Sequence, residues 1–78
     1  MKEVVEVLVK ALVDHPDDVE IIESPGDAPG VIRLDVHVAP DDAGKVIGRH
    51  GKIANALRAV AKASGQRVNQ RVFLDIVT

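Results

Sequence analysis

The stretch Val-Ile-Gly-Arg-His-Gly-Lys-Ile, residues 46–53, decides how the rest of this 78-residue sequence is interpreted. Two glycines, Gly48 and Gly51, bracket a two-residue turn and have apolar residues on both sides. The segments before and after the turn both have a helical pattern. Because glycine has no Cβ, a negatively charged group can approach the backbone of such a turn closely. The turn is a candidate anion-binding site, and the alternative is a plain helix–turn–helix connection whose glycines only cap helices.

Residues 52–64, directly after the turn, have the clearest helical pattern in the chain. Polar side chains at Asn55, Arg58 and Lys62 fall opposite a face of apolar and small residues. Gly65 is expected to end this helix, because glycine adopts the left-handed conformation at low cost. The predicted buried face consists of Ile53, Ala56, Leu57, Val60, Ala61 and Ser64.

Two further helices are predicted before the turn. Residues 2–14 carry one apolar stripe of helical spacing, and Pro16 disfavours helical geometry at the residue before it. A short helix is expected to open at Pro40, with Asp41 or Asp42 as its cap, and to stop at Gly48.

Three segments have the pattern of strands. Residues 31–38 and 71–77 alternate apolar and polar side chains, and residues 19–23 are rich in β-branched ones. A loop of residues 24–30 makes an antiparallel hairpin of the first two strands, whereas two intervening helices predict a parallel pairing of residues 31–38 with 71–77. The predicted fold is α+β, in the order αββααβ, with a three-stranded mixed sheet, three helices on one face and one domain over residues 1–78.

Charge is segregated along the chain, although the net charge is only −2. The first thirty residues carry a net charge of −6, and the remainder carries +4. Between Ala43 and Leu74 there are seven basic residues and no acidic one. Such a distribution is typical of an anion-binding face, and the alternative is a solvated surface that happens to be basic.

Composition argues against several classes of function. The chain has no cysteine, which excludes disulfides and thiolate metal sites, and its three histidines are scattered. We expect no metal, no cofactor and no catalytic activity. The apolar run near the N-terminus is interrupted by charges and too short to span a bilayer, so a cytoplasmic protein without membrane contact is expected. Phe73 is the single aromatic residue, so the stacking platforms of RRM and OB folds are missing.

With these features together, the chain resembles the type II KH domain, and more closely the small single-domain bacterial RNA-binding proteins of the KhpA family. Residues 44–53 carry the resemblance through an apolar pair, Gly-x-x-Gly and a further apolar residue, and residues 71–76 resemble the family's ending. The resemblance implies that the loop holds the backbone of about four nucleotides of single-stranded RNA. The implied RNA-binding residues are Lys45, Val46, Ile47, Gly48, Arg49, His50, Gly51, Lys52 and Ile53.

Different chemistry is expected of the members of this set. Arg49 can pair with a phosphate through two N–H groups, and the lysines add charge. Val46, Ile47 and Ile53 are predicted to form part of an aliphatic groove floor for the bases, near the edge of the 31–38 strand. Further contacts are possible from Arg58, Arg67 and Arg71, for which the alternative is a solvated surface.

The function expected from the resemblance is single-stranded RNA binding by a bacterial post-transcriptional regulator or RNA chaperone. The alternative is a protein-interaction module in which RNA is secondary. Similarity to the KhpA family implies a homodimer, or a heterodimer with a larger KH-containing protein, that affects cell elongation and division in some bacteria. A possible dimer face is the flank formed by Ala56, Ala59 and Ala63, for which simple helix propensity is the other explanation.

Overall fold

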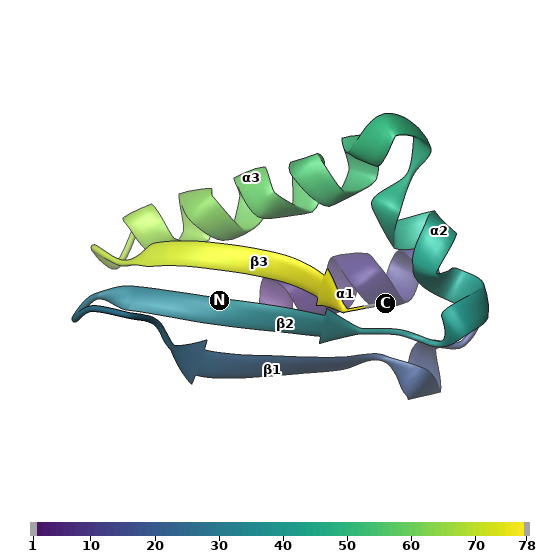
Figure 1. Ribbon diagram of the computed structural model, residues 1–78, viewed down its shortest axis with the longest axis horizontal. Coiled ribbons are helices and arrows are strands. Elements are labelled where there is room, and N and C mark those ends of the chain that lie inside the picture. The colour runs from purple at the N-terminus through teal and green to yellow at the C-terminus, as the bar shows by residue number, and fades with distance from the viewer. Residues whose placement is uncertain (1, 78) are drawn as a thin grey trace.

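The computed structural model describes residues 2–77, and it has the predicted element order (Figure 1). The first and last residues of the predicted domain lie outside this range. Short 3-10 turns precede β1, precede α2 and separate α2 from α3. The elements are α1 (Lys2–Leu12), β1 (Glu20–Pro25), β2 (Val31–His37), α2 (Ala43–Ile47), α3 (Lys52–Gln66) and β3 (Arg71–Val77).

The three strands form one mixed sheet in the order β1-β2-β3. β1 pairs antiparallel with β2, with Ile21 opposite Val36, and β2 pairs parallel with β3, with Leu34 opposite Leu74. This confirms the predicted pairing. β2 is therefore the central strand, and the 31–38 segment cannot offer a sheet edge to a ligand as expected. The edge on the side of α3 belongs to β3.

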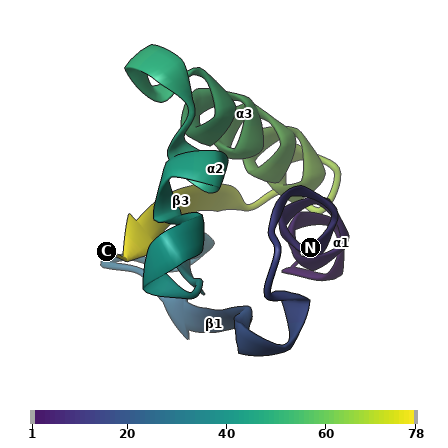
Figure 2. The same cartoon turned by 90° about the vertical axis from the view of Figure 1, so that its right-hand side faces the viewer.

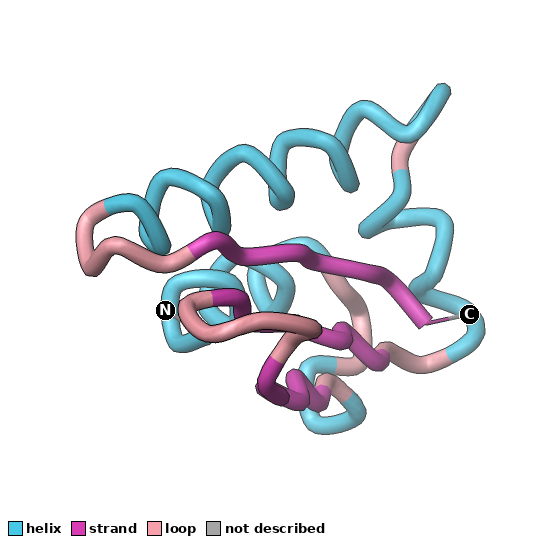
Figure 3. Tube along the Cα trace, turned by 60° about the vertical axis from the view of Figure 1, so that its left-hand side comes forward, coloured by secondary structure: helices cyan, strands magenta, loops and turns pink. Residues whose placement is uncertain are grey.

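All three helices cover the same face of the sheet, as predicted (Figure 2). Val5 and Val9 of α1 are fully buried in the core beneath the helices. Leu34 and Val36 of β2 belong to the same core and are also fully buried. The other face of the sheet carries no helix, as the trace in Figure 3 shows. Apolar side chains at alternate strand positions therefore meet a helical layer on one face only, which is the arrangement that period-two alternation predicts.

Helix α3 extends beyond its predicted end and buries a different line of residues. Gly65 lies inside the helix and is buried, so it does not terminate it. A Cβ on Gly65 would lie 2.5 Å from the Cγ2 atom of Val72. The glycine is needed because β3 packs directly against the helix there. The buried line is Ala54, Leu57, Ala61 and Gly65, rotated from the predicted face, on which Ala56 is exposed.

Asp42 does not cap α2 with its side chain as predicted. Its carboxylate is fully buried and instead accepts hydrogen bonds from the backbone N–H groups of Asp14 at 3.1 Å and His15 at 3.0 Å. These bonds join the end of α1 to the start of α2. Smaller differences concern boundaries, since α1 ends two residues earlier than predicted and β1 begins one residue later and ends two residues later.

Candidate nucleic-acid interface

The glycine-bracketed turn joins α2 to α3 at one end of the molecule, on the side where β3 also ends (Figure 1). Gly48 has φ 75° and ψ 175°, a combination essentially restricted to glycine. It has positive φ, but it is extended rather than left-handed as predicted. The left-handed conformation falls on His50 (φ 58°, ψ 25°) and on Gly51 (φ 72°, ψ 15°). Three residues with positive φ therefore shape a turn that exposes Arg49 and His50.

The two glycines are required for different reasons. A Cβ on Gly48 would lie 2.7 Å from the Cγ1 atom of Ile53, so the turn packs against its own helix at this point. A Cβ on Gly51 would have no atom within 4 Å. Gly48 is thus a packing residue, whereas the missing side chain at Gly51 leaves open space beside the start of α3. An anion can approach the backbone there.

Backbone donors are available in the same place. The amides of Gly48 and Gly51 donate to the carbonyls of Gly44 and Gly48 within the turn. Within residues 2–77, the amides of Arg49 and His50 have no backbone hydrogen-bond partner. The N-terminus of the 15-residue α3 adds its partial positive charge. The turn therefore offers unpaired amides, a helix dipole and the Arg49 guanidinium to one anionic group.

Lys45, one of the predicted RNA ligands, has acidic partners inside the protein. Its ammonium group contacts Asp14 and lies 3.4 Å from the Oδ1 atom of Asp42. The hydrogen bond to Asp14 raises the pKa of Lys45 above its usual value, so the lysine is fully charged at neutral pH. In this structure Lys45 serves to join α1 to α2. Its positive charge is balanced locally, whereas Arg49 and Lys52 have no ion pair within residues 2–77.

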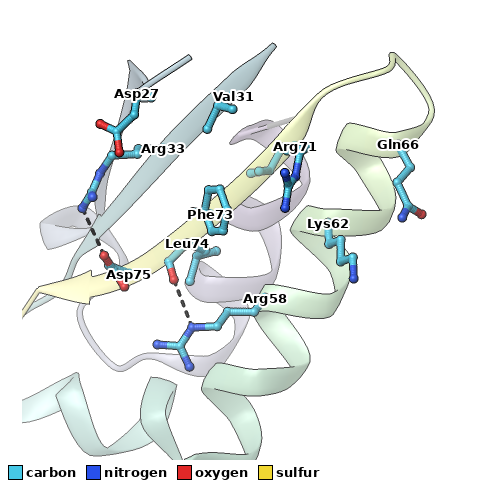
Figure 4. Close-up of a pocket in the computed structure, with 12 residues that line it drawn as sticks. Asp27, Val31, Arg33, Arg58, Lys62, Gln66, Arg71, Phe73, Leu74 and Asp75 are labelled. Atoms are coloured by element: carbon cyan, nitrogen blue, oxygen red, sulfur yellow. Dashed lines mark hydrogen bonds and ion pairs between the residues drawn. The ribbon is translucent and has the colours of Figure 1, made fainter. Parts of the chain in front are cut away.

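A cleft of about 640 Å³ runs between α3 and the edge of β3, and we call it the α3–β3 cleft (Figure 4). Arg58, Lys62 and Gln66 line it from α3, and Val72 and Leu74 line it from β3 with little of either residue exposed. The β1–β2 loop contributes Gly26 and Asp27 near the end remote from the turn. Basic side chains outnumber acidic ones in the lining, which includes Arg33, Arg58, Lys62 and Arg71 but also Asp27 and Asp75.

Of the three arginines predicted as possible additional RNA contacts, two line the cleft and one does not. Arg58 and Arg71 both line it, and the Arg71 guanidinium lies 5.9 Å from the centre of the Phe73 ring. Arg67, at the C-terminal end of α3, is exposed and does not line the cleft.

Comparison with known proteins follows this geometry. A family model described as "KhpA/KhpB, KH domain" matches residues 2–76. The chain belongs to the KhpA/KhpB KH-domain family. Several relatives carry the name RNA-binding protein KhpA, and three of them serve as examples. The one from Clostridium perfringens is 46% identical over 99% of this chain and 100% of its own length. The one from Halalkalibacterium halodurans is 49% identical over 99% of each, and the one from Streptomyces coelicolor is 48% identical over 86% of this chain and 82% of its own.

The fold of this KH domain also has a counterpart among solved structures. Era, in a complex with MgGDPNP and nucleotides 1506–1542 of 16S ribosomal RNA, superposes with a TM-score of 0.64. The match covers 95% of this chain but 28% of the Era chain, at 23% identity. At that identity the likeness shows the fold alone.

The structure places the three residues predicted for the aliphatic floor in different surroundings. Val46 is fully buried in the core, so it supports the fold and cannot contact a ligand. Ile53 is half-buried and lines a groove on the α1 side of α3 instead. Ile47 is half-buried at the end of α2. Val46 was assigned to the floor because residues next to the turn were assumed to face the ligand, whereas its side chain packs in the core.

Sequence reasoning named Arg71 of β3 as a possible RNA contact but overlooked Phe73, two residues further along the same strand. Phe73 was considered only as evidence against other folds, yet it is 53% exposed at the cleft beside Arg71. Arg33 and Lys62 also line the cleft. The available signal was the alternation of residues 71–77, which places Val72 and Leu74 on one side of the strand and Phe73 on the other.

A second, apolar groove of about 430 Å³ lies between α1 and α3, and we call it the α1–α3 groove. Leu8 and Leu12 line it from α1, and Ile53, Ala56 and Val60 line it from α3. Of the predicted dimer flank, Ala56 lines this groove, whereas Ala59 and Ala63 are exposed outside it. Within residues 2–77 there is no cluster of metal-binding side chains. None of the helices in that range is long and apolar enough to cross a membrane.

Proposed function

We propose that this chain binds single-stranded RNA, with one phosphate at the turn of residues 48–51 and the adjacent bases in the α3–β3 cleft. The observation that carries the proposal is the open space at Gly51 beside unpaired amides and the N-terminus of α3. The name RNA-binding protein KhpA, carried by relatives of similar length, supports it.

The phosphate would be held at the turn by backbone and side chain together. Within residues 2–77 the amides of Arg49 and His50 donate no backbone hydrogen bond, so both are free to bind the phosphate. The Arg49 side chain is exposed and can make a two-point contact with it. Lys52, exposed at the first position of α3, adds charge. Because Lys45 is paired with acidic groups, its contribution would be to position α2 and the turn.

The bases would lie along the edge of β3, where Phe73 is exposed, between basic side chains of α3 and β3. One exposed aromatic ring, Phe73, adds little stacking area compared with folds that stack several bases. A single such unit reads few bases, so we propose modest affinity, as in a bacterial post-transcriptional regulator or RNA chaperone of the cytoplasm. This role involves binding and no catalysed reaction.

Pairing with another KH protein is our second proposal, and it accompanies RNA binding. The α1–α3 groove is almost entirely apolar, and Val7 (68% exposed) and Val4 (45% exposed) on α1 extend the apolar surface around it. A second copy of this chain, or a larger KH-containing protein, would remove this surface from water and bring two RNA sites together, which raises the effective affinity.

The RNA site is tested by replacing Arg49 and His50 with aspartate together. Aspartate tolerates the left-handed conformation that His50 adopts, so the variant should fold. Binding of a labelled oligoribonucleotide, followed by fluorescence anisotropy, should weaken on the order of tenfold or more, because two acidic groups replace the phosphate partners. Arg67→Asp, at the far end of α3, is the matched control and should bind nearly as well as the wild type. Equal binding by the double variant and the wild type would refute the site.

Salt dependence and self-association test the remaining parts of the proposal. RNA affinity should fall steeply with salt concentration, whereas a flat response would exclude phosphate contacts. Sedimentation velocity at micromolar concentration should detect a dimer, and Ala56→Arg should weaken it more than Ala63→Arg, which lies outside the groove. A strictly monomeric wild type would contradict self-association.

A further inference from the structure

Arg58 extends from α3 to the edge of β3 and has a fixed orientation. Its Nε atom donates a hydrogen bond of 3.0 Å to the carbonyl oxygen of Leu74, and its Nη1 atom donates one of 3.0 Å to the Oδ1 atom of Asn55. One bond joins the guanidinium to β3 and the other joins it to its own helix, so both set the plane of the guanidinium. Figure 4 shows the terminal nitrogens directed away from β3, beyond the hydrogen bond to Leu74.

The hydrogen bonds of Arg58 leave its charge uncompensated. Arg33, on the neighbouring strand, is paired with the carboxylates of Asp35 and Asp75. Arg58 instead donates to a neutral carbonyl and a neutral amide, and within residues 2–77 it has no ion pair. A guanidinium has five N–H donors, so three of them, all on terminal nitrogens, remain without a partner in the described chain.

We propose that Arg58 determines base specificity in the cleft by binding a nucleobase that presents two adjacent hydrogen-bond acceptors on one edge. Guanine offers O6 and N7, and cytosine offers O2 and N3. In uracil and adenine a donor lies between or beside the acceptors. The guanidinium of Arg58 has only donors, so it can form at most one hydrogen bond with an edge of these bases. This inference rests on the proposed RNA-binding function and identifies the residue that would discriminate among bases.

The orientation of Arg58 is what makes the discrimination effective. Lysine at the same position would supply charge to a phosphate but no planar pair of donors. The tether to Leu74 also occupies the outward carbonyl of the β3 edge, so a base in the cleft meets the guanidinium at this point. A two-point contact of this kind typically discriminates against a wrong base by a factor on the order of tenfold.

The test uses labelled eight-residue oligoribonucleotides of uridine in which the two central positions are cytidine, guanosine, adenosine or uridine. Fluorescence anisotropy with the full chain should show on the order of tenfold tighter binding for the cytidine or the guanosine oligonucleotide than for the other two. The separate cytidine and guanosine arms show which of the two bases supplies the acceptors.

Three variants separate specificity from charge and from folding. Arg58→Lys should lose the base preference, because lysine keeps the positive charge but has no planar pair of donors. Lys62→Ala, on the same helix and lining the same cleft, should weaken all four complexes by a similar factor and keep the preference. Asn55→Ala removes one tether without touching the cationic group and should reduce the preference, which provides a second variant if Arg58→Lys unfolds.

The outcomes distinguish this inference from the proposed function. If the wild type binds all four oligonucleotides equally, or if Arg58→Lys keeps the base preference, the role of Arg58 is refuted while RNA binding stands. If the wild type binds none of them, the proposed function is refuted and this inference with it.

Discussion

The two glycines of the turn should respond differently to the same substitution, although both have positive φ. We expect Gly48→Ala to destabilise the fold severely and Gly51→Ala to impair RNA binding with a small loss of stability. The reason is their surroundings: a Cβ at position 48 meets the Cγ1 atom of Ile53 at 2.7 Å, and a Cβ at position 51 meets nothing within 4 Å.

The magnitudes follow from conformation and contact. At Gly48 the φ and ψ values suit glycine alone, which costs an alanine about 1–3 kcal/mol. Displacing Ile53 adds a cost typical of overpacking, about 1–3 kcal/mol. At Gly51 the left-handed conformation costs an alanine about 1–2 kcal/mol, and the reduced freedom of the unfolded chain offsets part of it. A domain of this size has about 4–12 kcal/mol of stability in total.

The assay is urea unfolding followed by circular dichroism, paired with RNA binding by fluorescence anisotropy at a temperature where each variant is folded. Gly48→Ala should lose a large part of the free energy of unfolding. Gly51→Ala should stay folded and bind RNA on the order of tenfold more weakly, because its methyl group occupies the space a phosphate would enter. Equal destabilisation by the two substitutions would refute the packing argument, and unimpaired binding by Gly51→Ala would refute the phosphate position.

Three further predictions concern the fold. Leu57→Ala, in the core with 3% exposure, should lower the free energy of unfolding by about 2–5 kcal/mol in urea titrations. Gly65→Ala should destabilise by about 1–3 kcal/mol despite the better helix propensity of alanine, because the new methyl group meets Val72; a stabilised variant would contradict the close packing. Burial alone would raise the pKa of Asp42, but its hydrogen bonds outweigh this and hold the pKa below the ordinary value of 3.8. Ionised Asp42 therefore stabilises the fold above that pH, and this stabilisation is lost as the pH falls through the lower folded pKa. The gap in unfolding midpoint between the wild type and Asp42→Asn should be largest near neutral pH and close on acidification, whereas Asp41→Asn should show no such gap.

Much of the candidate site was predictable because its signals are local. Glycines at positions 48 and 51, the basic stretch around them and the alternation of residues 31–38 and 71–77 are properties of neighbouring residues, and the structure has the elements they predict. Which side chain faces the ligand does not depend on neighbouring residues alone. Val46 and Lys45 were assigned to RNA from their position beside the turn. In the structure Val46 lies in the core, and Lys45 pairs with Asp14.

The structural roles of Gly65 and Asp42 also could not be predicted from neighbouring residues in the sequence. Glycine near a helix end usually marks the end, and aspartate before a helix usually caps it. Here β3 passes so close to α3 that only glycine fits, and the end of α1 comes close enough to take both carboxylate oxygens of Asp42. Both partners are supplied by segments distant in the sequence, and nothing in the local pattern indicates them.

The sequence alone therefore determined the order of the elements, the pairing of the strands and the location of the turn, because periodicity and glycine placement act over a few residues. Tertiary structure decided which side chains line the cleft between α3 and β3, and that Arg58 reaches across to Leu74. The physical reason is that a cleft is made by the approach of two surfaces. Its lining depends on how α3 is rotated over the sheet, and packing sets that rotation.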